Sequence, residues 1–167
     1  MATWTPAKTW SVDEILTADD LNTYVRDNTT ALHDRPADSV VTDGSGNQTT
    51  TSTSFVDVTG VEVTIEVSGH VMIGFNGMLG TSVIGGWVHL DIEIDGVRVG
   101  EDDGIAGAKT SAGSRTPVSF TWLSDELDPG SHDIKLQWKV SSGTGTLYSD
   151  NGTADNGWKA QFWVHEQ

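Results

Sequence analysis

The sequence predicts a mainly β protein, in which an N-terminal arm and one α-helix precede an antiparallel, jelly-roll-like β-sandwich of about eight strands. Two observations predict this fold. From residue 55 onward, apolar residues alternate with polar ones in short segments separated by turn residues. Only residues 15–36 carry the signals of a helix. We therefore expect an arm and helix over 1–36, a polar linker over 37–54 and a sandwich over 55–167.

Composition and charge argue against several classes of protein. The chain has 167 residues and no cysteine, so neither disulfides nor thiolate metal sites can form. No apolar run approaches the length of about 18 residues that a membrane span needs, so we expect no membrane insertion. The net charge of −15 repels phosphate backbones, so we expect no nucleic-acid partner. Such an excess of acids also suits concentrated salt, which would fit a halophilic source.

The predicted helix is well specified at both ends. Thr17 can cap its start, with Asp20 completing a Thr-x-x-Asp capping pattern, and Pro36 disfavours helical backbone at the residue before it. The apolar face is a narrow heptad stripe with one polar member: Leu21, Val25, Asn28 and Leu32. A short helix with so thin a stripe needs a partner. The partner could be the β body, but the narrow stripe favours the same helix of neighbouring chains, with Asn28 fixing the register.

The segment before the helix holds two tryptophans, Trp4 and Trp10, around Thr5-Pro6. Each indole would hide about 200 Å² when buried, so both are costly to leave in water. They could anchor the arm on a neighbouring protein, or they could fold back on the chain's own body. Both interpretations stay open at the sequence level.

The strands of the predicted sandwich follow from alternation and turn signals. Asp95-Gly96 predicts a two-residue hairpin turn within residues 87–100, and Asp128-Pro129-Gly130 predicts a turn before the strand at 131–140. Trp138 shares the parity of the apolar residues of its strand and is expected in the core. The remaining strands are expected at 55–67, 70–79, 118–123 and 159–167.

Motifs of enzymes are missing from the sequence, so we expect no catalytic activity and no cofactor. The five histidines lie singly on different predicted elements, which favours structural roles over metal binding. Acidic runs such as 101–104, and the carboxylates of Asp91, Glu93 and Asp95, fit a solvated acidic face better than a calcium site. Among the seven tryptophans, Trp158 and Trp163 could stack on a sugar ring, although burial in an oligomer would use them equally well.

The helix and the body together resemble a known class of protein. The segments "LTADDLNTYVRDN" and "TSTSFVDVTGVEVTI" are similar to virion structural proteins of tailed viruses, and "LDIEIDGVRVGEDDGIAG" and "LDPGSHDIKLQWKV" resemble their jelly-roll domains, broadly of the tumour-necrosis-factor-like trimer type. The helix motif is carried by eight residues: Leu16, Thr17, Ala18, Leu21, Asn22, Arg26, Asp27 and Asn28.

This resemblance implies a location and a role. The arm and helix would attach the protein and join it into a homotrimer, and the sandwich would be displayed on the virion. The partners would be other copies of the chain and capsid or tail proteins. A capsid decoration, a tail-fibre section and a receptor-binding tip that contacts a host-surface glycan share the same parts, so the resemblance does not choose between them.

Overall fold

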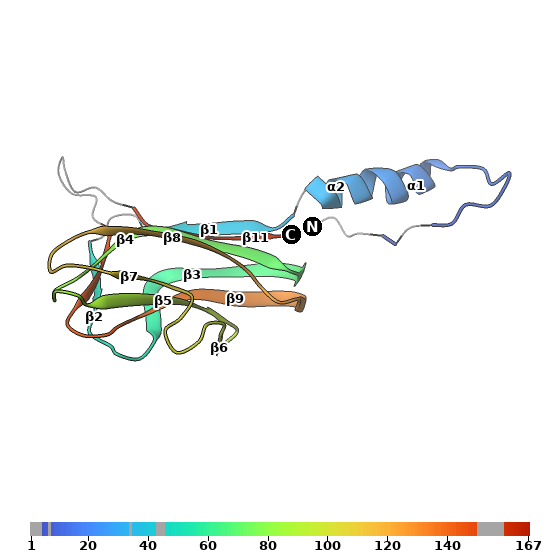
Figure 1. The fold of residues 1–167 in the computed structure, drawn as a ribbon. Coiled ribbons are helices and arrows are strands. Elements are labelled where there is room, and N and C mark those ends of the chain that lie inside the picture. Colours follow the sequence, from blue (N-terminus) through green and yellow to red (C-terminus); the bar gives the residue numbers. More distant parts are fainter. Residues whose placement is uncertain (1–4, 7, 34, 43–45, 150–158) are drawn as a thin grey trace. The chain divides into compact units, whose positions relative to one another are not determined.

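The computed structural model (Figure 1) describes residues 5–6, 8–33, 35–42, 46–149 and 159–167. The chain divides into two compact units, Met1–Pro36 and Ala37–Gln167. The first unit is helical and the second is built of strands. In the described part of the chain, no helix has the length and apolarity needed to cross a membrane.

The helix of the first unit has three consecutive parts: α1 (Ala18–Leu21), the π-helical stretch η1 (Asn22–Asp27) and α2 (Asn28–His33). The predicted capping box is confirmed: the Asp20 amide donates to the Thr17 hydroxyl at 3.1 Å, and the Thr17 amide donates to the Asp20 carboxylate at 3.1 Å. These bonds satisfy two of the amide groups that the first turn leaves without helical partners. The start of the helix is therefore fixed locally.

The second unit is an antiparallel sandwich, as predicted (Figure 1). The first sheet contains β1 (Ala37–Val41), β2 (Gln48–Thr50), β4 (Val71–Thr81), β8 (Thr116–Leu123), β10 (Gly145–Tyr148) and β11 (Gln161–Glu166). The second sheet contains β3 (Val56–Gly69), β5 (Trp87–Ile94), β6 (Val97–Arg98), β7 (Ala106–Lys109) and β9 (Leu127–Val140).

Strand order gives the sandwich its jelly-roll winding. In the first sheet β4 pairs with β8 along one edge, and with β11 and then β10 along the other. In the second sheet β9 lies between β3 and β5. The chain changes sheet between β3 and β4, between β4 and β5, and at each step from β7 to β10. This repeated crossing is characteristic of a jelly roll.

Alternating apolar side chains from both sheets form the core. Along β3 the inward residues Val61, Val63 and Ile65 are buried, and the polar residues between them are exposed. Trp138 of β9 is also buried, which confirms its predicted place in the core. Each fully buried aliphatic side chain contributes about 1.5–3 kcal/mol. The two sheets are thus held together by the alternation that predicted them.

Residues 37–54 are not a linker, and this prediction is wrong. They include β1 and β2, which pair with β11 and β10 at the edge of the first sheet. An edge strand can be held by backbone hydrogen bonds along one side and needs little apolar surface. Only Val40 of β1 packs against the core, so the segment carries no period of two in its apolar residues.

The two predicted turns have different outcomes. Asp95 and Gly96 both have positive φ and connect the paired residues Ile94 and Val97, so the two-residue hairpin is confirmed. The turn predicted at 128–130 is wrong, because these residues lie within β9. There the register with β3 shifts between Val67 and Gly69, which makes a bulge that accommodates a proline without a backbone N–H.

Candidate binding surfaces

The N-terminal arm packs on the helix of its own unit. The Thr5 amide donates to the Asn28 side-chain oxygen at 2.8 Å, and the Asn28 side-chain nitrogen donates to the Thr5 carbonyl at 3.0 Å. Trp10 meets Tyr24 edge to face, with ring centroids 5.8 Å apart. Trp10 still exposes 40% of its surface, and its role as an anchor stays a prediction. Trp4, the other predicted anchor, lies outside the described residues.

Lys8 joins the arm to the start of the helix. Its ammonium group lies 2.6 Å from the Glu14 carboxylate and 3.0 Å from that of Asp20, and 4.3 Å from the centroid of the Trp10 ring. The hydrogen bond to Glu14, followed by that to Asp20, raises the pKa of Lys8. Hydrogen bonds from Thr17 and then from Lys8 lower the pKa of Asp20 to about 2. The arm is thus tied to the helix at both ends of its described part.

Asn28 lies against the arm of its own chain and not on the exposed side of the helix, and its predicted place at the oligomer interface stays a prediction. It is 8% exposed, and its side-chain amide is occupied by Thr5 of the same chain. The heptad stripe assumes α-helical spacing, but the π-helical stretch η1 has more residues per turn and rotates everything after it. As a result, Asn28 faces the arm while Leu21 and Val25 remain exposed.

The exposed apolar side chains at and before the helix form what we call the apolar flank. Leu21 and Val25 expose 50% and 56% of their surface. The apolar flank comprises Ile15, Leu16, Leu21 and Val25. Leu32 lies in α2, but its side chain is not among those that the structure describes. The predicted interface role of Leu21, Val25 and Leu32 stays a prediction.

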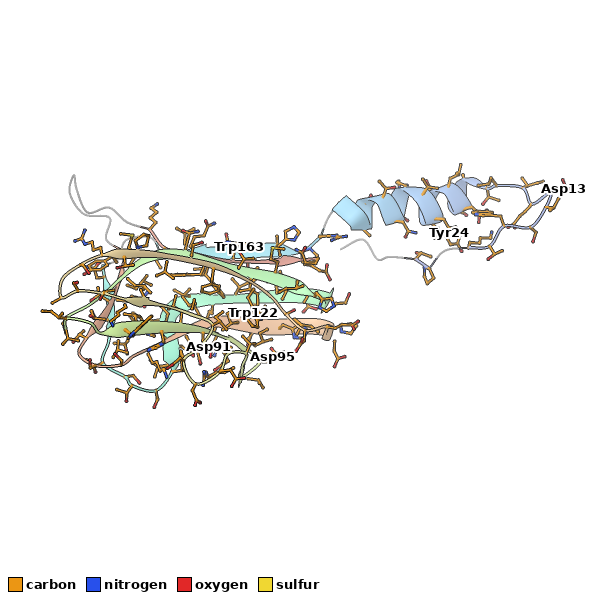
Figure 2. All side chains as sticks on the ribbon, viewed as in Figure 1. Asp13, Tyr24, Asp91, Asp95, Trp122 and Trp163 are labelled. Atoms are coloured by element: carbon orange, nitrogen blue, oxygen red, sulfur yellow. The ribbon has the colours of Figure 1, made fainter. Side chains whose placement is uncertain are left out.

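Trp163 lies on the outer face of the first sheet (Figure 2). Its register partner is Gly74 of β4, and a Cβ atom at Gly74 would collide with the indole. The ring therefore lies over the glycine and is half-buried. One face of the indole is covered by the chain's own backbone. Trp158, the other predicted sugar-stacking residue, lies outside the described residues.

The acidic face of the second sheet is occupied by the protein's own donors. Asp91 is fully buried and accepts from the Arg98 guanidinium at 2.6 Å and from the Gly100 amide at 2.9 Å. Glu93 accepts from the Gln137 amide nitrogen at 2.5 Å. The expectation of a solvated face is wrong for Asp91, because the Arg98 guanidinium takes the place of water at its carboxylate. No group of His, Cys, Asp or Glu in the described residues is arranged to hold a metal ion.

Asp95 and His132 form a further pair at the β5–β6 hairpin (Asp95 is labelled in Figure 2). His132 is buried, with Nδ1 2.7 Å from the Asp95 carboxylate and Nε2 2.8 Å from the Asp128 carbonyl. Both neighbours are acceptors, so both ring nitrogens are satisfied only in the imidazolium form. The hydrogen bond to Asp95 raises the pKa of His132, and the same bond lowers the pKa of Asp95.

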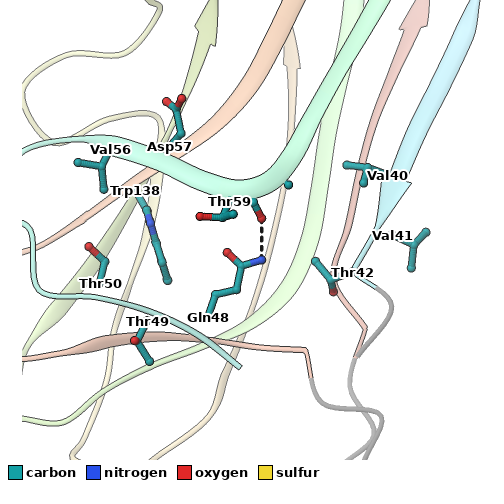
Figure 3. A pocket seen from close by; sticks show the side chains of 11 residues that line it. Val40, Val41, Thr42, Gln48, Thr49, Thr50, Val56, Asp57, Thr59 and Trp138 are labelled. Carbon is teal, nitrogen blue, oxygen red and sulfur yellow. Dashed lines mark hydrogen bonds between the residues drawn. The ribbon is translucent and has the colours of Figure 1, made fainter. Parts of the chain in front are cut away.

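A cleft of about 770 Å³ opens beside β2, β3 and β9 (Figure 3). Gln48 bridges it by donating to the Thr59 carbonyl at 2.8 Å, and Trp138 lines it. Asp57, the one carboxylate of its described lining, already accepts from Gln137 at 2.8 Å and from Lys135 at 3.4 Å. Threonine hydroxyls and valine methyl groups make up most of the remaining lining, so the cleft offers little charge to a ligand.

A smaller hollow of about 590 Å³ lies on the outer face of the second sheet, between β5 and the loop before β7. Trp87 and His89 stand side by side on β5, with ring planes 21° apart and centroids 5.8 Å apart. Across from them are the exposed carboxylate of Asp103 and the glycines Gly104 and Gly107. The hollow thus combines an exposed aromatic side chain with an exposed carboxylate.

Comparison with known proteins gives no family. No model of a protein family matches the sequence, and no curated protein matches it. A solved structure of the infectious bursal disease virus Gt strain matches with a TM-score of 0.49 and 14% identity, covering 100% of this chain and 43% of that one. This chain spans 36% of the matching chain of the Gx strain of the same virus and 43% of that of the Gt strain, so it covers less than half of their length.

Two further solved structures are similar over most of their own length. One is a carbohydrate-binding module of Cellvibrio mixtus lichenase 5A in complex with cellotriose. It matches with a TM-score of 0.35 and 18% identity, covering 78% of this chain and 97% of that one. The other is Eiger TNF from S. frugiperda, which matches with a TM-score of 0.43 and 12% identity, covering 80% of this chain and 94% of that one. With TM-scores under 0.5, these likenesses carry no conclusion about family or function.

Proposed function

We propose that the protein is a non-catalytic structural component of a virus particle, a homotrimer whose N-terminal unit attaches it and whose β-sandwich is displayed. The observation that carries the proposal is the apolar flank. Leu21 exposes half of its surface and Val25 slightly more than half. Both lie on a helix whose other side is already covered by the arm. Apolar side chains left in water on a short helix favour burial against another protein surface.

The sequence resemblance to virion proteins of tailed viruses supports this assignment, because it covers the same helix and the jelly-roll body. The division of the chain into two units fits it as well, since attachment and display can then be separate tasks. The partners in this proposal are two further copies of the chain and a capsid or tail protein. Its location is the virion.

Sedimentation equilibrium of the intact chain and of two double variants tests the proposal. Leu21→Asp with Val25→Asp places charges on the apolar flank and should convert the trimer into monomers while the sandwich stays folded. The control, Thr29→Asp with Thr30→Asp, adds the same charge at exposed positions of the same helix and should leave the trimer intact. A monomeric parent chain at micromolar concentration would overturn the proposal.

A second proposed role is binding of a host-surface glycan or receptor by the displayed sandwich. The observation that favours this role is the hollow beside Trp87, which offers an exposed indole and an exposed carboxylate within one site. Trp163 supports the role less, because Gly74 backs its ring on one side. A glycan array probed with the labelled protein tests the role, and a blank array would count against it.

A further inference from the structure

We propose that the hollow between Trp87 and Asp103 binds one residue of a neutral saccharide. This inference rests on the glycan-binding role proposed above and names its site and the class of its ligand. The site lies on the second sheet, whereas Trp163, which the sequence singled out, lies on the first.

The aromatic wall of the hollow is held in place by the sheet. The Trp87 amide donates to the Ser141 hydroxyl at 3.0 Å, and the Ser141 amide donates to the Trp87 carbonyl at 3.1 Å. His89 follows two residues later, with its ring nearly parallel to the indole. Trp87 nevertheless exposes 40% of its surface. An indole fixed at its backbone but open to solvent provides an apolar surface for the C–H face of a sugar ring at little cost in side-chain entropy.

The opposite wall is fixed by a glycine. Gly104 has a φ of +76°, and a Cβ atom there would collide with the Leu90 carbonyl and crowd the Phe55 ring. The Gly104 amide donates to the Glu101 carbonyl and the Ile105 amide to the Leu90 carbonyl, both at 2.9 Å. The loop therefore lies close against β5, and a side chain at Gly104 would push it away.

This loop places a hydrogen-bonding group at the rim. His89 Nδ1 donates to the Asp103 carbonyl at 3.1 Å, and the Asp103 carboxylate lies 3.3 Å from the Lys139 ammonium group. The Asp103 side chain is 81% exposed, so the carboxylate has room for more donors. Paired hydroxyl groups of a sugar can donate to one carboxylate, and such charge-assisted hydrogen bonds are about twice as strong as neutral ones.

Charge selects a neutral ligand. The chain carries a net charge of −15, and Glu101, Asp102 and Asp103 follow one another at this rim. A sialylated or sulfated glycan would be repelled both by the whole molecule and by this loop. A saccharide without acidic groups keeps the stacking on the indole and the hydrogen bonds to Asp103 without that repulsion.

The test is a glycan array carrying neutral, sialylated and sulfated glycans, followed by titration calorimetry of the intact protein with the best neutral glycan. Trp87→Ala should weaken binding about tenfold, as expected from the loss of one aromatic contact. Asp103→Asn should weaken binding several-fold, and because this side chain is exposed, the variant should fold as the parent does. Trp122→Ala, which removes a comparably exposed indole from the first sheet, should leave affinity unchanged.

The other possible outcomes separate the site, the class of ligand and the glycan-binding role. Binding of neutral glycans that neither Trp87→Ala nor Asp103→Asn weakens overturns the site and leaves the glycan-binding role standing. A blank array overturns both. Preference for sialylated or sulfated glycans overturns the assignment of a neutral ligand. Because an indole beside a carboxylate also suits a quaternary ammonium ion, binding of choline that both variants weaken, together with a blank array, would replace the saccharide with a cation.

Discussion

At the scale of single residues, the ion pair of His132 and Asp95 makes stability depend on pH. The pKa of His132 is raised in the folded state, so its contribution is fully present below the unfolded value of about 6.5 and is lost as pH rises through the folded pKa. The pKa of Asp95 is lowered, so its contribution is present above the unfolded value of about 3.9 and is lost as pH falls through the folded pKa. Between these limits both groups are charged and the pair is complete.

We therefore predict that His132→Gln lowers the free energy of unfolding by about 1 kcal/mol at pH 6, with a smaller loss at pH 9. Denaturant unfolding at the two pH values measures both differences. His165→Gln, at an exposed histidine of β11, is the control and should show neither effect. An equal loss for His132→Gln at both pH values would mean that the pair contributes no charge-dependent stability.

The contact of Trp163 with Gly74 is another single-residue feature with a measurable effect. Gly74→Ala should destabilise the sandwich by about 1–3 kcal/mol, because the new methyl group collides with a rigid indole. In a Trp163→Ala background the same substitution should cost much less, since the ring is gone. Denaturant unfolding of the two single variants and the double variant measures the coupling. Additive losses would contradict the contact.

At the scale of elements, the helix shows where local rules succeed and where they fail. The capping box at Thr17 and the turn at Asp95-Gly96 were predictable, because each depends on residues within a few positions of one another. The π-helical stretch was not, since its hydrogen bonds leave no pattern of apolar residues in the sequence. The heptad stripe drawn through it placed Asn28 with Leu21 and Val25, on the wrong side of the helix.

Asn28→Leu separates the two interpretations of this helix. A leucine in a heptad seam would strengthen self-association. In the structure, the same substitution removes both hydrogen bonds to Thr5, so the arm should come away from the helix. We predict faster amide exchange over residues 8–11 and no gain in self-association, measured by hydrogen–deuterium exchange and by sedimentation. A tighter oligomer with unchanged exchange would restore the heptad seam.

The strands also differ in how far the sequence could predict them. The core strands were predictable because one face of each is apolar, as along β3 and β9. The edge strands β1 and β2 were not, because polar residues held by backbone pairing look like a linker. The hollow at Trp87 was not predicted: the sequence analysis singled out Trp158 and Trp163, and the carboxylate of Asp103 comes close to Trp87 only through the fold.

At the scale of the whole molecule, charge sets the response to salt. A net charge of −15 makes the folded chain repel itself, and raising chloride salt from about 0.1 M to about 1 M shortens the screening length from about 10 Å to about 3 Å. We predict that the melting temperature rises over this range. Potassium chloride is the suitable salt, because sulfate stabilises most proteins by exclusion from their surface. A falling melting temperature would show that attractive ion pairs outweigh the repulsion.

The proposed trimer is also a property of the whole molecule: in it, copies of the chain would meet along the apolar flank of the N-terminal unit. The natural absence of cysteine allows a direct measurement, since one introduced thiol has no other partner within the chain. Two residues can be joined by a disulfide only when their Cα atoms lie within about 7 Å of each other.

Mild oxidation of Val25→Cys, followed by electrophoresis without reductant, is that measurement, with Glu62→Cys on the exposed face of β3 as the control. We predict rapid formation of a covalent dimer by the Val25→Cys chain, because one disulfide can join two of the three chains of the proposed trimer, and none by the control. A Val25→Cys chain that stays uncrosslinked, or links no faster than Glu62→Cys, would contradict the claim that the helices meet.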